Sequence, residues 1–334
     1  MPNLIDPKIA VIGGGTGSFT ILSGLKHYSK NISAIVNMAD DGGSTGQLRD
    51  ELGVLPPGDV RQCLVALSNS PKMRDLFNYR FDSGSLDGHA FGNLFLTALE
   101  KMTGSFAEAI DVADEVLNVQ GRVIPVTLDS VKLVMKTKND AKDIIGEYQI
   151  GNMNFNLSQK RPKLELAPKA KLNPEAKKAL FDADMIVIAP GNLYGSLAPA
   201  LLVDGMAEAL TMAKAKIIFV CNLVTKPGQT DGFMVDDFAS ELERFVGKQF
   251  IDLVLFNTEE PSKNLEARYI KDAEYMVGYS LLAKKSKHYK VRGSNLLAKE
   301  LPKTNSADKI QRTRSYIRHD PDLVARELMN IYGE

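Results

Sequence analysis

The sequence has no net charge and no long hydrophobic run, and each lack excludes a class of protein. Its 41 lysine and arginine residues balance 41 aspartate and glutamate residues, whereas a surface that coats nucleic acid needs an excess of basic residues. No apolar stretch approaches the roughly 20 residues that a membrane-spanning helix requires. We therefore expect neither a nucleic-acid partner nor a membrane span.

Cysteine is also scarce, and a signal-peptide pattern is absent. The two cysteines, Cys63 and Cys221, lie in apolar segments, which predicts buried free thiols in a reducing compartment. The first seven residues lack the charged-then-apolar pattern of a secretory signal. These features predict a cytoplasmic protein.

Short apolar runs that end in glycine- or asparagine-rich turns are the main pattern of the chain. Residues 8–12, 185–189 and 217–221 are such runs, and 32–36 is a further β-branched run. Helical spacing of apolar residues follows the first run. Strand, turn, helix and strand in succession indicate a parallel sheet. We predict an α/β fold, with a Rossmann-like parallel sheet, flanking helices and a small β-rich insertion.

The 334 residues permit about two domains by length, but no linker or repeat divides the chain. We predict a single nucleotide-binding α/β domain over residues 1–334. Within it we expect a helical segment over about 59–120 and a β-rich insertion over about 122–165.

Several individual elements follow from local patterns. Asp59 is a plausible N-cap of the helical segment, residues 148–150 are expected as a strand, and residues 197 to about 213 as one long helix. The closing helix over 321–332 is expected to be capped by Asp320.

The glycine-bearing turns suit a phosphate-bearing ligand. In open α/β sheets, ligands bind outside the carboxyl ends of the strands, where glycine lets backbone N–H groups approach phosphate oxygens. Glycine at one tight turn is also explained by sterics alone, but four such turns on one edge favour a nucleotide site. The candidate ligand-binding residues on these turns are Gly13, Gly14, Gly15, Thr16, Gly17, Asn37, Asp40, Asp41, Gly42, Gly43, Ser44, Gly191, Asn192, Ser196, Asn222 and Lys226.

The familiar dinucleotide and P-loop patterns are not met. Ser18 stands where the dinucleotide fingerprint has its last glycine, and Asn37 follows the second strand where an acidic ribose ligand is expected. The sequence also lacks the P-loop pattern G-x-x-x-x-G-K-[ST]. NAD and P-loop chemistry are therefore disfavoured.

Other polar residues allow both a functional and a structural role. Asp40 and Asp41 can hold Mg²⁺ against a diphosphate, or they form an Asx-turn that stabilises the loop. His89 and Asn93 flank glycines at a helix start and could face the ligand. Arg318 precedes the closing helix and could contact a phosphate.

Seven segments together resemble the family that contains the bacterial YvcK proteins, called gluconeogenesis factors, and the archaeal CofD transferases. They are Ile12–Gly17, Ile35–Gly46, Leu55–Arg61, Gly88–Leu94, Ala189–Ser196, Cys221–Thr230 and Ile317–Pro321. The resemblance covers nearly the whole chain except residues 263 to 315. It implies a Rossmann-like core that binds a nucleotide diphosphate conjugate.

The two branches of the family imply different functions. The CofD branch transfers phospholactate from a guanosine diphosphate conjugate with Mg²⁺. The YvcK branch, which the DDGGSTG, LPPGD and IRHDP segments resemble, binds a UDP-sugar such as UDP-N-acetylglucosamine, with roles in carbon metabolism, cell shape and envelope maintenance. By resemblance, Tyr269 and Arg318 contact the UDP-sugar. Asn192 departs from the bacterial pattern, which has serine there.

Two functions therefore remain open at this point. One is a UDP-sugar-binding regulatory protein that requires no cofactor, favoured by the branch-specific segments and by the lack of an evident nucleophile. The other is a CofD-like transferase with Asp40 and Asp41 on Mg²⁺, because phosphoryl chemistry needs little beyond positioning and charge neutralisation. The sequence also leaves a homo-oligomer open.

Overall fold

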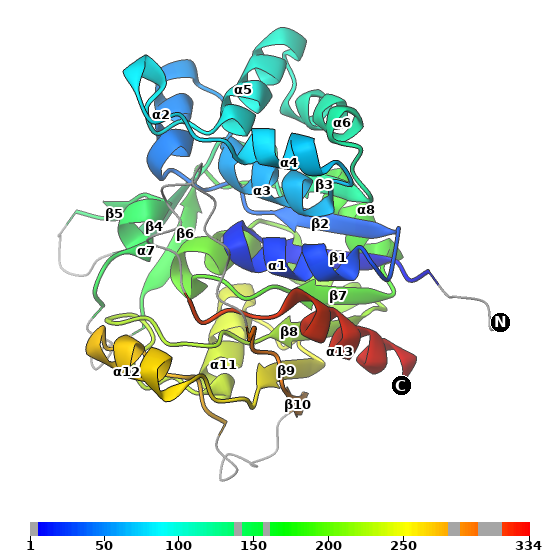
Figure 1. Cartoon of the computed structure of the whole chain (residues 1–334), viewed down its shortest axis with the longest axis vertical. Helices are drawn as coiled ribbons and strands as arrows, with labels where there is room; N and C mark the ends of the chain where they lie inside the picture. Colours follow the sequence, from blue (N-terminus) through cyan, green and yellow to red (C-terminus); the bar gives the residue numbers. More distant parts are fainter. Residues whose placement is uncertain (1–5, 137–141, 156–160, 280–287, 300–315) are drawn as a thin grey trace.

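A seven-stranded parallel sheet forms the centre of the molecule (Figure 1). The computed structural model describes residues 6–136, 142–155, 161–279, 288–299 and 316–334. Within these residues the strand order is β10-β9-β8-β7-β1-β2-β3, and every pairing is parallel. The strands are β1 (Ile9–Gly13), β2 (Ile32–Val36), β3 (Arg122–Pro125), β7 (Met185–Ile188), β8 (Lys216–Val220), β9 (Leu253–Asn257) and β10 (Lys290–Ser294).

The strand order reverses at β1. The chain adds β2 and β3 on one side of β1, then returns to add β7, β8, β9 and β10 on the other. Strands β1 and β7 pair in register from Ile9 with Met185 to Ile12 with Ile188, and all four residues of β7 are buried. In such sheets the crevice at the reversal is the usual ligand site. The arrangement confirms the predicted α/β fold with a Rossmann-like sheet.

Helices cover both faces of this sheet. On one face α13 and α3 pack on either side of α1, and Figure 1 shows α1 and α13 in front of the strands. On the other face α10 packs on α8 and α11 packs on α9 and β9. The bounds are α1 (Gly15–Leu25), α3 (Pro57–Leu67), α8 (Pro174–Asp182), α9 (Ala198–Leu201), α10 (Met206–Met212), α11 (Val235–Val246) and α13 (Pro321–Gly333).

Further helices and a small sheet extend this core. Helices α4 to α6 pack around α3 beyond β2 and β3, and a three-stranded antiparallel sheet in the order β5-β4-β6 lies where the main strands end (Figure 1). The remaining elements are α2 (Gly43–Leu52), α4 (Pro71–Asn78), η1 (Gly84–Leu86), α5 (Phe91–Thr103), α6 (Phe106–Leu117), β4 (Lys132–Lys136), β5 (Ile144–Ile145), α7 (Glu147–Gly151), β6 (Lys163–Ala167), η2 (Leu193–Leu197) and α12 (Lys263–Lys271).

The small sheet is the predicted β-rich insertion, although the chain uses its first part differently. Residues 122–125 join the main sheet as β3, and the insertion runs from β4 to β6. Residues 137–141 and 156–160 of the predicted insertion lie outside the described residues, as do 280–287 and 300–315 of the segment without a family match. The single-domain organisation stays a prediction.

Three local predictions were wrong. Residues 148–150 belong to helix α7 rather than to a strand. The expected long helix is interrupted, because π-helix η2 and α9 are separated from α10 by a turn in which Gly205 has φ +95°. Asp59 does not cap its helix, since α3 begins at Pro57 and Asp59 lies in its first turn. The predicted cap at Asp320 is confirmed, because its carboxylate accepts the N–H groups of residues 322 and 323.

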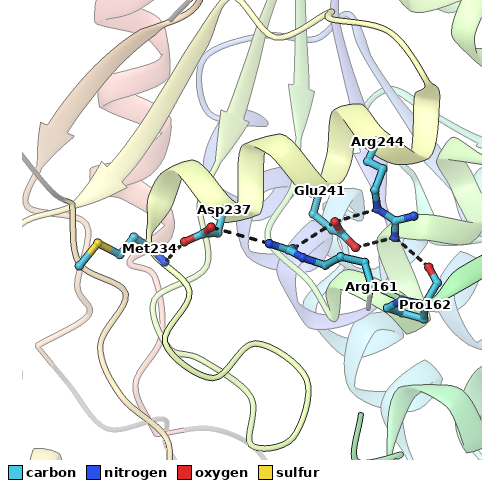
Figure 2. Close-up of polar contacts among 6 residues, drawn as sticks. All are labelled: Arg161, Pro162, Met234, Asp237, Glu241 and Arg244. Carbon is cyan, nitrogen blue, oxygen red and sulfur yellow. Dashed lines mark hydrogen bonds and ion pairs between the residues drawn. The ribbon is translucent and has the colours of Figure 1, made fainter. Parts of the chain in front are cut away.

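A buried charged side chain links α11 to the segment that leads into β6, the last strand of the insertion (Figure 2). The side chain of Glu241 is only 2% exposed and contacts Arg161 at 3.1 Å and Arg244 at 2.6 Å. Arg244 also donates to the carbonyl of Pro162 at 2.9 Å, just before β6. The guanidinium of Arg161 stacks 4.4 Å from the ring centre of Phe233. These contacts fix the small sheet against the body of the molecule.

Candidate functional site

The predicted loops meet at the carboxyl edge of the sheet, as the parallel strand order requires. Residue Gly17 of α1 packs directly on the carbonyl of Pro190 in the turn after β7, where no side chain fits. The backbone N–H of Asn37 donates to the carbonyl of Gly13 at 3.1 Å. The amide of Asn222 donates to the carbonyl of Gly191 at 2.7 Å. Turns after four neighbouring strands therefore form one continuous surface.

A pocket of about 390 Å³ opens at the reversal of strand order between β1 and β7. We call it the switch-point pocket, and its wall includes Thr16, Gly17, Gly191, Asn222, Arg318 and His319. The first turn of α1 supplies Thr16, and its N-terminus carries a partial positive charge. Arg318, from the segment before α13, adds a full positive charge to the wall of the same pocket. Five of the predicted ligand residues are thus brought together here.

Tyr269 supports the segment that brings Arg318 to this pocket. Its hydroxyl accepts the backbone N–H of Tyr316 at 2.6 Å and that of Ile317 at 2.9 Å, directly before Arg318. The ring is buried in a small cluster with Leu223 and Ile317, and it is not among the described residues that line the pocket. Tyr269 therefore holds the segment that carries Arg318, and the direct contact with a UDP-sugar that the resemblance implies stays a prediction.

Four carboxylates gather beside the first glycine loop. Burial and the nearby Asp40 raise the pKa of Asp59 to about 7. Burial, followed by Asp40, Asp59 and Asp41, raises the pKa of Glu147 to about 8, and Lys226 opposes this rise. Burial also raises the pKa of Asp40. We call Asp40, Asp41, Asp59 and Glu147 the carboxylate cluster.

Three of these carboxylates occupy helix N-termini. Asp40 accepts the N–H of Gly42 at 3.0 Å at the start of α2, and Asp59 accepts the N–H of Gly15 at the start of α1. Asp41 accepts the N–H of Tyr148 at 2.8 Å in the first turn of α7. Because helix N-termini favour negative charge, these contacts stabilise the carboxylates that burial destabilises. Asp59 also takes the space beside Gly14, where a side chain would collide with its carboxylate.

The cluster suits a cation only with help from a ligand. Among the described residues no three Asp, Glu, His or Cys side chains are arranged to hold a metal ion by themselves. Mg²⁺ commonly binds through one or two carboxylates together with substrate phosphates and water. Besides burial, like-charge repulsion by Asp40 raises the pKa of Asp59, and a cation between two such carboxylates would relieve that repulsion. Asp40 with Asp59 is one candidate pair and the predicted Asp40 with Asp41 stays the other, because each of the three carboxylates already accepts a backbone N–H group.

A second pocket, of about 660 Å³, lies on the other side of Asp40. We call it the α2–α3 pocket, and its wall includes Asp40, the residues 42–45 at the start of α2, Arg61, Arg80, Asn93 and Tyr148. The Ser44 hydroxyl meets Nδ1 of His89 at 3.1 Å and accepts from the Asn93 amide at 3.1 Å. The Arg61 guanidinium donates to the side-chain amide oxygen of Asn93 at 2.9 Å. The predicted residues Ser44, His89 and Asn93 are thus joined in one buried network.

Helix α7 is held over the edge of the sheet by three side chains that converge on its last carbonyl. Gly151 O accepts from Asn192 at 2.9 Å, from Gln229 at 2.9 Å and from Lys226. The side-chain amide oxygen of Asn192 also accepts the N–H groups of Tyr194 and Gly195 at the start of η2, the helix that contains Ser196. Two predicted ligand residues, Asn192 and Lys226, therefore position α7.

Asp59 and Glu147 are the site residues that the sequence interpretation missed. Asp59 follows Pro-Pro-Gly, a context that is typical of a helix start, and it was assigned a capping role on that ground. Glu147 precedes a segment whose apolar residues suggested a strand. The first-turn position of Asp59 was visible in the sequence, but its contact with the loop at Gly14 and Gly15 arises only on folding.

Comparison with known proteins identifies the family. The family model of 2-phospho-L-lactate transferase CofD matches residues 9–297. A putative gluconeogenesis factor from Thermoanaerobacterium thermosulfurigenes is 42% identical over 330 residues, covering 98% of both chains. The gluconeogenesis factor of Bacillus subtilis is 36% identical over 331 residues, covering 98% of this chain and 99% of the relative. The chain belongs to the CofD/YvcK family.

The fold of this CofD/YvcK family member has a crystallographic counterpart. A protein of the UPF0052 family from Bacillus halodurans superposes with a TM-score of 0.85 at 35% identity, over 96% of this chain and 99% of the other. Among the helices that the structure describes, none combines the length and hydrophobicity of a membrane crossing.

Proposed function

We propose that the chain is a UDP-sugar-binding regulatory protein, with the diphosphate in the switch-point pocket. The observation that carries this proposal is the pocket at the reversal of strand order, where the first turn of α1 and Arg318 face one space. A diphosphate carries the negative charge that a helix N-terminus and a guanidinium bind together. The names of the full-length relatives, gluconeogenesis factors, support a regulatory role in carbon metabolism, and the resemblance adds cell shape and envelope maintenance.

The carboxylate cluster favours one alternative, a CofD-like transferase. Its members Asp40 and Asp59 lie close enough to interact, because Asp40, after burial, raises the pKa of Asp59. Asp40 with Asp59 or Asp41 would hold Mg²⁺, which in such enzymes neutralises charge on the transferred group. The family model, which is that of a transferase, supports this alternative.

The test separates a sensor from an enzyme by following both binding and turnover. We expect UDP-N-acetylglucosamine to raise the melting temperature and to remain intact after long incubation with Mg²⁺. At about a hundredfold excess over the dissociation constant, the stabilisation should be about 2.7 kcal/mol, a shift of a few degrees for a chain of this size. GDP and NAD should stabilise less.

Two results would redirect the proposal. Steady release of UDP or of a sugar phosphate identifies a transferase, and Asp59→Asn should then abolish the release while UDP binding persists. Stabilisation by GDP conjugates without stabilisation by UDP-sugars points to the CofD branch instead.

A further inference from the structure

The α2–α3 pocket is a second cavity on the edge of the sheet that the switch-point pocket occupies. The described residues that line the two pockets include none in common. They are linked through the carboxylate cluster, because Asp40 lines the α2–α3 pocket and Asp59 beside it accepts the N–H of Gly15, next to Thr16 of the switch-point pocket. The two pockets therefore lie on either side of the carboxylate cluster.

The α2–α3 pocket has balanced charge, unlike a phosphate site. The charged side chains among its described lining residues are Asp40, Asp87, Arg61 and Arg80, two of each sign. Asp40 already accepts the Gly42 N–H and the Thr45 hydroxyl at the start of α2, so a carboxylate of the chain takes the place an anion would have there. Arg61 donates to Asn93 and to Asn78 at 2.7 Å. This charge pattern fits an uncharged ligand better than an anion.

One wall of the pocket is aromatic. Tyr148 at the start of α7 is 62% exposed, and Phe81 lines the same pocket. The Tyr148 ring lies next to Gly42, where a Cβ atom would be 3.1 Å from its Cδ2, and its backbone N–H donates to Asp41. Gln47 and Gln62 supply amide groups to the wall of the same pocket. An exposed ring beside several amides is the pattern of a site that binds a ring with hydrogen-bonding substituents.

We infer that the α2–α3 pocket holds the sugar ring of the nucleotide sugar against Tyr148, while the diphosphate lies in the switch-point pocket. The inference rests on the proposed function and adds the residues that select the sugar. Sugar specificity then resides in elements that the nucleotide does not touch: α2, the loop before α5, and Tyr148 of the insertion.

The experiment compares UDP with UDP-N-acetylglucosamine by calorimetry on the full chain. Tyr148→Ala should weaken binding of UDP-N-acetylglucosamine about tenfold, as loss of a stacking ring does, and leave binding of UDP unchanged. Tyr148→Phe keeps the ring and should bind both ligands as the wild type does. Tyr28→Ala is the matched control, because Tyr28 is an exposed tyrosine outside both pockets.

Each other outcome is decisive. Equal weakening of UDP and UDP-N-acetylglucosamine by Tyr148→Ala overturns the inference, because it shows a general effect on the fold. Unchanged binding of both ligands also overturns it and leaves the pocket to a separate molecule. If the wild type binds neither ligand, the proposed function fails instead, which distinguishes the two claims.

Discussion

Arg318 is the residue on which the phosphate contact of the proposed site depends. Arg318→Ala should weaken UDP-sugar binding by about 1.5–3 kcal/mol without unfolding the protein, since a charge-assisted hydrogen bond is lost. Lysine at this position should recover only part of the loss, because it lacks the planar two-pronged donor. Titration calorimetry measures the change. Arg326→Ala, which removes an exposed arginine from α13, is the control, and an effect of equal size there would remove the special role of Arg318.

His319, the next residue, makes stability depend on pH. Burial lowers its pKa to about 4, although a hydrogen bond with the backbone of Cys221 opposes the change. Because the unfolded chain binds a proton at about pH 6.5 and the folded protein does not, stability is full above that value and falls as pH falls toward 4. Between pH 7.5 and pH 5 this one group should remove about 2 kcal/mol.

Urea unfolding of His319→Asn tests this dependence. The variant should lose about 2 kcal/mol less than the wild type between these pH values. His27→Asn, at an exposed position after α1, should keep the dependence of the wild type. Parallel curves for His319→Asn and the wild type would contradict the assignment.

At single positions, sequence patterns predict the role of a residue where its neighbours in the chain decide that role. They fail where the role depends on contacts that form only on folding. Glycines before a helix and Arg318 before Asp320 are recognisable along the chain, and the structure places several of them on one pocket. The high pKa of Asp59 depends on Asp40 and on burial, which no spacing in the sequence encodes. The contacts of Asn192 and Lys226 with α7 are likewise set by folding, and their role as ligand residues stays a prediction.

Among the three side chains that hold α7, Gln229 makes the most hydrogen bonds to it. Its amide, only 1% exposed, donates to the carbonyls of Ile150, Gly151 and Met153 at 2.9–3.0 Å. Gln229→Ala should destabilise the protein by about 2 kcal/mol, because the carbonyls of Ile150 and Met153 lose this side-chain donor. Hydrogen exchange should also become faster in residues 147–153. Gln149→Ala, on the exposed side of α7, should change neither quantity.

The contacts of α11 predict an unequal response to substitution (Figure 2). Arg161 and Arg244 are 36% and 38% exposed, whereas Glu241 is 2% exposed. Removing both arginines leaves a buried carboxylate without a positively charged partner and should cost about 3 kcal/mol. Glu241→Gln leaves two arginines that water can solvate and should cost about 1 kcal/mol. Urea unfolding of Glu241→Gln and of the Arg161→Met, Arg244→Met double variant measures the difference, and a reversed order would contradict the explanation.

Long elements were easier to predict than short ones. The buried runs at β1, β2, β7 and β8 were found because several apolar residues in succession leave few alternatives. Residues 148–150 have too few apolar positions to distinguish a strand from a turn of helix, and contacts from Gln229 and Asn192 decide in favour of the helix.

For the whole molecule, the strand order is the property that sequence patterns left undetermined. Buried parallel strands have similar apolar runs, so periodicity does not tell which neighbours pair. The placement of β7 beside β1 creates the switch-point pocket, and it comes from packing of helices on both faces. The family resemblance implied a Rossmann-like core but not the order of its strands.

The switch-point pocket also has a consequence for synthesis on the ribosome. One wall comes from Thr16, near the beginning of the chain, and another from Arg318, near its end. Translation proceeds at roughly 5–20 residues per second, so the first wall emerges long before the second. A nascent chain that has not yet reached Arg318 therefore lacks one wall of the pocket.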